Sequence, residues 1–268
     1  MRRELWRFAV TNKGLSIFLS CLILCIPWTA VLFYFRAPVG AYVILNAFWV
    51  FFSVLAAEGS KIRLMNDAIK HMNEKCDPTL LLEETQIMLE AKHKGQEEQV
   101  FVINRAVALR EMGHYGEARA MLESLNVDKY VSFLPLNKVV YYNNLADICF
   151  LTGDFENARK WYEKSHRILS DLKDGKQKEK LKETVGMSFV QLDIMDKNYA
   201  EALKKLSAIK KNNMQTRVEA NYLMGMCHME LNDRDAARSC FQFVLDNGNR
   251  LHRVDQAFKI LKNMDGRS

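Results

Sequence analysis

The stretch NNLADICFLTGDFENARKWYEKS, residues 143–165, decides the fold of this chain. Its first part carries the small residue Ala146 on one helical face, and a Gly153-Asp154 pair then interrupts the helical pattern. Glycine supplies the backbone freedom that a tight turn needs. After the turn the pattern resumes, with Ala158 and the aromatic Tyr162 on one face. The stretch therefore predicts two helices that are joined by a short turn and pack through small residues.

The same spacing recurs in residues 104–125, 188–209 and 221–245. Each segment has an alanine early in its second helix: Ala118, Ala158, Ala202 and Ala237. Small residues also occupy the first helices, at Ala106, Ala146 and Gly225. The third segment departs from the pattern, because its first helix is weaker and Lys197 stands where glycine is expected. A single helical hairpin cannot bury its apolar face, so these units are expected to stack into one continuous core.

This pattern resembles the tetratricopeptide repeat, a helix–turn–helix unit of about 34 residues. The resemblance covers residues 99–250, and a capping helix is expected at 251–264. The steps between units exceed the usual period, and the excess is assigned to linkers at 126–136 and 170–178. The fold class that follows is all-α, a tetratricopeptide-like solenoid. A generic array of helical hairpins is the alternative.

The resemblance implies a binding module, because arrays of this family hold a peptide or protein segment in a concave groove lined by the first helices. One subfamily grips a C-terminal carboxylate with a Lys/Asn/Arg clamp, which is missing here and disfavours a receptor for chaperone tails. Asparagine side chains pair with a ligand backbone in both directions. The predicted partner-binding residues are Asn104, Asn143, Asn144, Asp147, Gln191 and Tyr222. The alternative is that these side chains are merely solvated.

Two charge-free runs of 21 residues, 15–35 and 37–57, precede the repeats and are separated by Arg36. A membrane-spanning helix needs about 20 apolar residues. The sequence therefore predicts a transmembrane hairpin at 15–57, with spans at 15–35 and 38–57, after a basic tail at 1–14. The first run is longer than the apolar core of a cleaved signal peptide. Neither run carries an acid or a base, which argues against a channel or a transporter.

The distribution of Lys and Arg predicts the orientation of this hairpin. Four basic residues lie in the leading tail and four more follow the second run, whereas the intervening loop has Arg36 alone. Basic residues are enriched on the cytoplasmic side. Both termini are therefore predicted to be cytoplasmic. The sequence thus predicts a multi-pass protein of the cell membrane, of the bacterial two-span type. Within the spans, Asn46 is expected to hydrogen-bond Ser20 or Thr29 across the hairpin, or else to mediate self-association.

Juxtamembrane helices are predicted at 58–98. Residues 58–75 show helical periodicity and are expected to continue the second span. The sequence Cys76-Asp77-Pro78 breaks this helix, and Asp77 is expected to cap a following helix at 79–93. The Lys94-Gly95 pair is expected to end that helix.

Motifs for catalysis and for cofactor or metal binding are absent from the sequence: it has no phosphate loop, no G-x-S-x-G and no H-E-x-x-H. The six cysteines include no C-x-x-C pair and are expected to be reduced, mostly buried thiols. His71, Cys76 and Asp77 lie close in sequence, but three mixed residues without a fourth are interpreted as coincidence. The chain is therefore predicted not to be an enzyme.

A basic stretch, residues 173–217, holds eleven Lys or Arg and six acids. Contact with anionic lipid headgroups is one predicted use of this excess, and a solvated helix face is the alternative. Nucleic acid is not a predicted partner, because aromatic residues do not alternate with the lysines.

The sequence thus predicts a non-catalytic, membrane-anchored scaffold that binds a protein or peptide partner at the cytoplasmic face. A peptide-responsive signalling regulator is the alternative. An enzyme with a site assembled between hairpin and repeats is a third hypothesis, and it lacks convergent acids, bases or nucleophiles.

Overall fold

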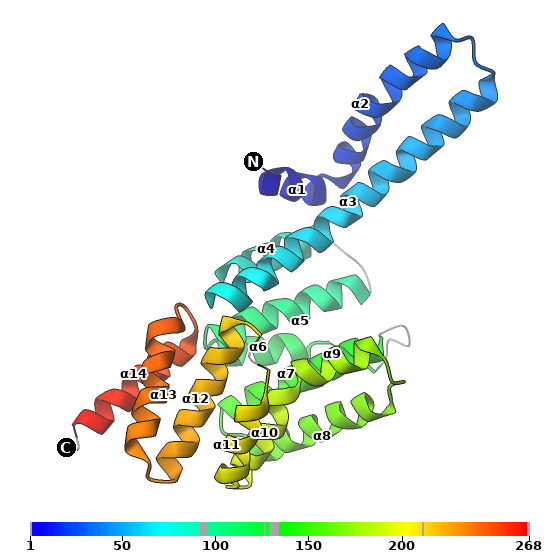
Figure 1. The fold of residues 1–268 in the computed structure, drawn as a ribbon. Helices are drawn as coiled ribbons and strands as arrows, with labels where there is room; N and C mark the ends of the chain where they lie inside the picture. The colour runs from blue at the N-terminus through cyan, green and yellow to red at the C-terminus, as the bar shows by residue number, and fades with distance from the viewer. Residues whose placement is uncertain (1, 92–95, 126, 129–133, 211, 267–268) are drawn as a thin grey trace. The chain divides into compact units, whose positions relative to one another are not determined.

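The computed structural model describes residues 2–91, 96–125, 127–128, 134–210 and 212–266 (Figure 1). These residues form fourteen helices and no strand, as the predicted all-α class requires. The chain divides into two compact units. The first contains Met1–Ala68 and Glu83–His93, and the second contains Ile69–Leu82 and Lys94–Ser268.

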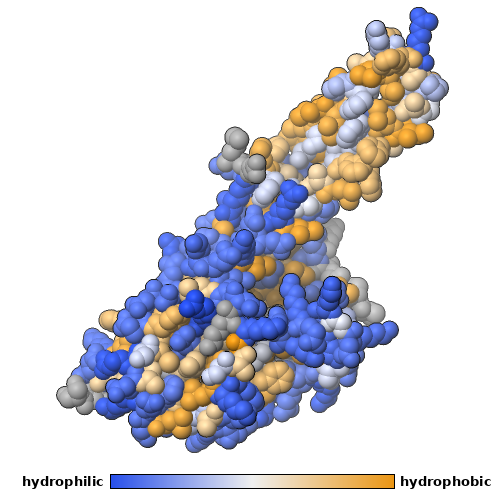
Figure 2. Space-filling view, in the orientation of Figure 1, coloured by the Kyte–Doolittle hydropathy of each residue, from blue (hydrophilic) through white to orange (hydrophobic). Residues whose placement is uncertain are grey.

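The first unit begins with α1 (Arg2–Thr11), followed by the long helices α2 (Lys13–Tyr34) and α3 (Val39–Lys75). Helices α2 and α3 are long and apolar enough to cross a membrane. None of the α2 side chains is buried, and apolar side chains cover the visible face of the hairpin (Figure 2). The two predicted apolar helices are therefore present, and their apolar surface faces outward.

The predicted hydrogen bond between Asn46 and the facing helix is wrong. The Asn46 side chain donates instead to the carbonyl oxygen of Tyr42 in its own helix, at 2.9 Å. A carbonyl one turn away in the same helix thus takes the place of a partner in the facing helix. Across the hairpin, the rings of Trp28 and Trp49 stack with centroids 6.4 Å apart.

Helix α3 continues past the apolar run to Lys75, as predicted, and ends at Cys76, whose φ is +53°. Asp77 Oδ1 then accepts hydrogen bonds from the Thr79 backbone N–H (3.0 Å) and the Thr79 hydroxyl (2.6 Å). This is the predicted capping residue at the start of α4 (Thr79–Glu90). Helix α4 ends at Glu90 and not at residue 93, and the predicted stop at Lys94-Gly95 lies outside the described residues.

The second unit contains the repeats, each a pair of helices (Figure 1). The four pairs are α5 (Gln96–Glu111) with α6 (Tyr115–Glu123), α7 (Pro135–Leu151) with α8 (Phe155–Asp171), α10 (Gly186–Met195) with α11 (Tyr199–Ala208), and α12 (Met214–Glu230) with α13 (Arg234–Asn247). Helix α14 (His252–Asp265) follows the last pair. An unpredicted helix, α9 (Lys176–Thr184), corrects the linker expected at 170–178. Its polar sequence, KQKEKLKET, carries too little apolar periodicity to reveal a helix.

Small residues form the seams between paired helices, as the repeat pattern predicts. Ala118, Ala158, Ala202 and Ala237 are fully buried. A β-carbon at Gly225 would lie only 2.8 Å from the ring of Phe241. The paired helices therefore approach closely because these positions carry little or no side chain.

The turn of each repeat places one residue at positive φ: Gly113 at +84°, Gly153 at +79°, Lys197 at +60° and Asn232 at +60°. A side chain with a β-carbon costs roughly 1–2 kcal/mol in this left-handed region, which glycine adopts freely and asparagine tolerates. Lys197 is thus strained where the sequence departs from the repeat pattern.

Replacing Lys197 by glycine is expected to stabilise the protein by up to about 1 kcal/mol, because relief of strain exceeds the added entropy of the unfolded chain. Thermal unfolding of the full-length protein in detergent micelles measures the effect. Asn232→Gly is the matched control and should change stability less. Equal effects of the two substitutions would contradict this account of the turn.

Candidate functional site: a polar groove in the repeat unit

A cavity of about 450 Å³ lies among the first helices of the repeats. Residues of α5, α7, α10 and α12 line it, joined by residues of α9 and α14. Its volume falls within the range of about 300–1,000 Å³ that is usual for binding pockets. The cavity is therefore large enough for a short peptide segment or a few side chains of a partner.

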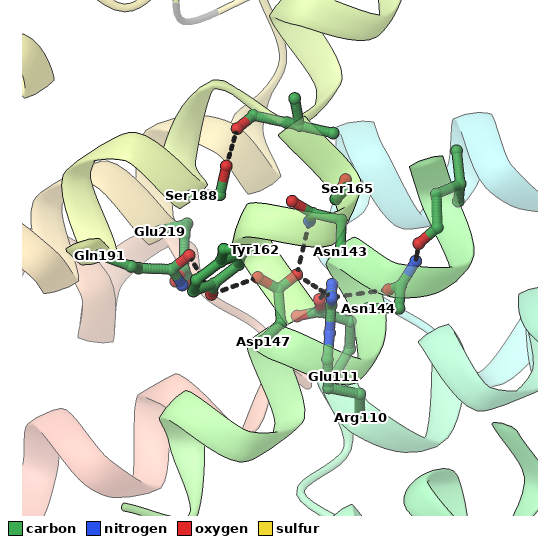
Figure 3. A network of polar contacts seen from close by, with 12 residues as sticks. Arg110, Glu111, Asn143, Asn144, Asp147, Tyr162, Ser165, Ser188, Gln191 and Glu219 are labelled. Atoms are coloured by element: carbon green, nitrogen blue, oxygen red, sulfur yellow. Dashed lines mark hydrogen bonds and ion pairs between the residues drawn. The ribbon is translucent and has the colours of Figure 1, made fainter. Parts of the chain in front are cut away.

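The centre of this groove is a polar network around Asp147 of α7 (Figure 3). Arg110 Nη1 of α5 donates to Asp147 Oδ2 at 2.5 Å and to Asn144 Oδ1 at 2.7 Å. Asn143 Nδ2 donates to Asp147 Oδ2 at 3.2 Å. Asn143, Asn144 and Asp147 face the groove together because residues three and four apart share one side of a helix.

Tyr162 of α8 connects this network to the next repeat. Its hydroxyl lies 2.8 Å from Asp147 Oδ1 and 2.6 Å from Gln191 Oε1 of α10. Burial, together with the Asp147 carboxylate, raises the pKa of Tyr162 well above its ordinary value. The phenol therefore keeps its single proton, which it can donate to only one of these two oxygens at a time, and its hydroxyl lies between the second and third repeats.

Two arginines of the groove, Arg110 and Arg253, are buried, and each has carboxylate partners. Arg110 pairs with Glu111 and Asp147, both at 2.5 Å. Arg253 of α14 makes two bonds to Glu219 of α12, at 2.8 and 2.9 Å. Burial by itself lowers the pKa of Arg253, but Glu219 outweighs this effect and the net shift is upward. The groove is consequently charged but internally neutralised.

One polar atom of the groove has no partner. The Oδ1 atom of Asn143 is buried and accepts no hydrogen bond from the described residues. The residue is 8% exposed and lines the cavity. Its Nδ2 already donates to Asp147, which fixes the orientation of the amide. A buried acceptor without a donor costs about 1–3 kcal/mol, so this atom favours a ligand that brings an N–H or O–H group.

Four of the predicted groove residues, Asn143, Asn144, Asp147 and Gln191, line the cavity, and two do not. Tyr222 packs against the ring of Phe241 and lies beneath the Arg253 guanidinium, 4.4 Å from it. Asn104 of α5 is half-buried outside the cavity lining. Asn104 and Tyr222 therefore lie outside this cavity, and partner binding by any of the six residues stays a prediction. A first-helix position in the sequence does not distinguish the groove side of a helix from its flank.

Sequence reasoning missed the charged residues of the network: Arg110, Glu111, Glu219 and Arg253. A weak signal was available, since Arg110 lies three residues after Val107 and seven after Ile103, on the face assigned to the groove. Arg253 gave no signal, because its helix was predicted only as a polar-faced cap. Its side chain is 7% exposed and points into the array.

The last repeat contacts the beginning of the repeat unit. Arg250 N–H donates to the carbonyl oxygen of Cys76 at 3.1 Å, and Asn249 Nδ2 donates to the carbonyl oxygen of Lys75 at 2.8 Å. The ring of His252 covers Gly113 and meets the ring of Tyr115 edge-on at 5.7 Å. The array is therefore closed by contacts between its two ends.

A serine and a histidine lie at a distance typical of nucleophile and base, but elsewhere in the unit. Ser188 Oγ is 2.6 Å from His166 Nε2 and also 2.6 Å from the carbonyl oxygen of Val185. Ser188 is fully buried, so a substrate has no access to its hydroxyl. The pair is a packing contact that links α8 to α10.

Many lysines of the basic stretch are paired with acids of the same stretch. Lys178, Lys182, Lys204, Lys205 and Lys210 form ion pairs with Asp174, Glu179, Glu201, Asp193 and Glu183. These pairs reduce the charge available to a membrane. The predicted contact with anionic lipid stays a prediction.

Comparison with known proteins supports the assignment of the repeats. A family model described as tetratricopeptide repeat matches residues 139–168 and 218–245. Residues 139–168 and 218–245 are therefore identified as tetratricopeptide repeats. The matched segments correspond to α7 with α8 and to α12 with α13, the second and fourth helix pairs of the unit. No curated protein and no solved structure matches the chain. Tetratricopeptide repeats typically form protein-interaction scaffolds without catalytic activity.

Proposed function

We propose that this protein is a non-catalytic scaffold, anchored in the cell membrane by α2 and α3, that binds a protein or peptide partner in the tetratricopeptide groove. The observation that carries the proposal is the orphaned acceptor Asn143 Oδ1 in the cavity wall. A peptide brings a backbone N–H at every residue except proline. Such a donor would satisfy this oxygen, and the neighbouring side chains Asn144, Asp147 and Gln191 would contact the same segment.

The membrane part of the proposal rests on the two apolar helices and on the charges that flank them. Water contact with so much apolar surface is unfavourable by about 25 cal/mol per Å². Basic residues at both ends of the hairpin and Arg36 alone in its loop favour cytoplasmic termini. The groove would then face the cytoplasm, where the partner would be recruited.

Binding of selected peptides to the full-length protein in lipid nanodiscs tests the groove. Peptides are first selected from a random display library and their affinities then measured by fluorescence anisotropy. We expect Asn143→Leu to weaken binding roughly 5- to 150-fold, which corresponds to the loss of one hydrogen bond to a buried acceptor of about 1–3 kcal/mol. The same substitution removes the unsatisfied oxygen and also the hydrogen bond from Nδ2 to Asp147. These two effects on stability oppose each other, so thermal stability should change little.

Asn104→Leu is the matched control, since Asn104 is an asparagine of α5 outside the cavity lining. It should leave peptide affinity unchanged. The proposal would be wrong if both substitutions weakened binding equally, or if Asn143→Leu lost affinity only by unfolding the protein.

A peptide-responsive regulator is the second candidate, and the contacts that close the array favour it. A ligand that separates the 249–252 segment from Gly113 and Cys76 would couple groove occupancy to a change in shape. Fluorescent probes on α6 and α14 would then move apart when peptide binds. A scaffold would bind with their separation unchanged.

A further inference from the structure

Helix α1 has two unlike faces, and its inner face is held by α4. Arg3 Nε donates to Glu84 Oε1 at 2.7 Å, and Arg7 Nε donates to the same carboxylate at 3.1 and 3.2 Å. Arg7 Nη2 also donates to Glu83 at 3.1 Å. Glu84 is completely buried. Val10 of α1 is buried as well. Two of the basic residues of the tail are therefore neutralised within the protein.

The outer face of α1 is apolar and exposed. Leu5 is 60% exposed and Phe8 is 40% exposed. They lie three residues apart and so point to the same side of the helix. Trp6 lies between the two faces, with the Arg63 guanidinium of α3 over its ring at 5.7 Å. This pattern, apolar on one side and basic on the other, is typical of helices that lie in a membrane interface.

The position of α1 within its unit matches that pattern. Helix α1 meets α2 at Asn12, whose φ and ψ of −118° and 48° break the helix, and α1 turns away from the axis of α2 (Figure 1). An ion pair joins Lys13, the first residue of α2, to Glu58 of α3. Both charge-free runs lie between these two residues in the sequence. Helix α1 is therefore at the end of the hairpin where the lipid headgroups would lie.

We propose that α1 lies in the plane of the membrane interface, with Leu5 and Phe8 embedded in lipid and with Arg3 and Arg7 held by Glu83 and Glu84. The inference rests on the proposed membrane anchoring. Because the two arginines already have carboxylate partners, the insertion of α1 depends on its apolar side chains and not on anionic lipid. The carboxyl-terminal half of α4 is thereby held close to the lipid surface.

Fluorescence quenching in liposomes tests this placement on the full-length protein. A polarity-sensitive fluorescent amino acid is introduced by codon suppression at position 5, which avoids the six native cysteines. The lipids carry a nitroxide quencher near the headgroup boundary. We expect the probe at position 5 to show a blue shift and to lose most of its emission, equally in pure phosphatidylcholine and in mixtures with phosphatidylserine.

Two further probe positions separate this inference from membrane anchoring itself. Position 18 of α2 should be quenched by lipid labelled deeper in the acyl chains, and the exposed position 156 of α8 should not be quenched. If position 18 is not quenched, both the anchoring and the interfacial helix are wrong. If position 18 is quenched and position 5 is not, the interfacial helix alone is wrong. Quenching at position 5 only with phosphatidylserine would show that the arginines bind lipid and not Glu84.

The substitution Glu84→Gln provides a second readout, because it removes the carboxylate that holds Arg3 and Arg7. Quenching at position 5 should then increase when phosphatidylserine is added, since the freed guanidinium groups would pair with anionic headgroups. Glu90→Gln, the same change in the exposed last turn of α4, should leave quenching independent of lipid charge. Circular dichroism confirms that both variants remain folded. A Glu84→Gln protein without any lipid-charge dependence would overturn the assigned role of Glu84.

Discussion

Arg110→Met is expected to lower the free energy of unfolding by about 3–5 kcal/mol, because it leaves buried carboxylates without their counter-charge. Asp147 loses the guanidinium at 2.5 Å, Glu111 loses its partner, and Asn144 Oδ1 loses a donor. Methionine keeps most of the side-chain volume, so the effect is electrostatic and not a cavity effect. Chemical denaturation of the full-length protein in detergent micelles, followed by circular dichroism, measures it.

The double variant Arg110→Met with Asp147→Leu is the control for this interpretation. Replacing both members of a buried ion pair by apolar residues is often neutral or stabilising. We therefore expect the double variant to recover much of the stability lost in the single variant. A double variant that is less stable than Arg110→Met would show that the Asp147 carboxylate stabilises the protein through Asn143 and Tyr162 more than its uncompensated charge destabilises it, and would contradict this interpretation.

The pH dependence of Arg110→Met gives an independent check. Burial raises the pKa of Asp147, and Arg110 and the Tyr162 hydroxyl oppose this shift. A carboxyl with a folded-state pKa above its unfolded value of about 3.9 favours the folded state at low pH, and this advantage is lost as pH rises through the folded pKa. Without Arg110, burial raises the pKa of Asp147 further. The difference in the free energy of unfolding between wild type and Arg110→Met should therefore become smaller as pH falls from neutrality towards about 4.

Gly113→Ala is expected to destabilise the protein by about 2–5 kcal/mol, from two separate causes. The left-handed φ of +84° costs roughly 1–2 kcal/mol once a β-carbon is present. That β-carbon would also lie 2.5 Å from the His252 ring, and overpacking adds roughly 1–3 kcal/mol. The second cause exists only because the last repeat closes onto the turn of the first.

Gly153→Ala separates these two causes, since Gly153 has a similar φ of +79° and open space around its β-carbon position. It should lose only the conformational part, roughly 1–2 kcal/mol. Adding His252→Ala to Gly113→Ala removes the ring that the new β-carbon would contact, so it should recover the stability lost through overpacking. Thermal and chemical unfolding of the four proteins provide the comparison. Equal losses for the two glycines would mean that His252 does not close the array.

Local features of the fold were predictable because their causes lie within a few residues. Glycine at positions 113 and 153, an alanine at a constant place in each second helix, and Asp77 before α4 each act through neighbouring backbone. The charge-free runs were equally clear, since length and composition alone define a candidate span. Helix α9 escaped prediction because eight of its nine residues are polar, and Leu181 alone does not make an apolar stripe.

The candidate site was predictable only in part. Asn143, Asn144 and Asp147 follow from the periodicity of one helix, so the sequence groups them correctly. Asn104 and Tyr222 look equivalent in the sequence but lie outside the cavity lining. Which side of a first helix faces the groove depends on the rotation between stacked repeats, and that rotation is set by side-chain packing over the whole unit.

The sequence by itself determined the helices, the turns, the small-residue seams and the two apolar spans, because periodicity and composition encode local burial. The tertiary structure alone decided that Arg110 compensates Asp147, that Asn143 Oδ1 is left without a donor, and that His252 covers Gly113. Arg110 and Asp147 are separated by 37 positions in the sequence, and Gly113 and His252 by 139. Such distant partners meet only after the repeats have stacked, and the energy of each contact depends on burial that no single segment possesses.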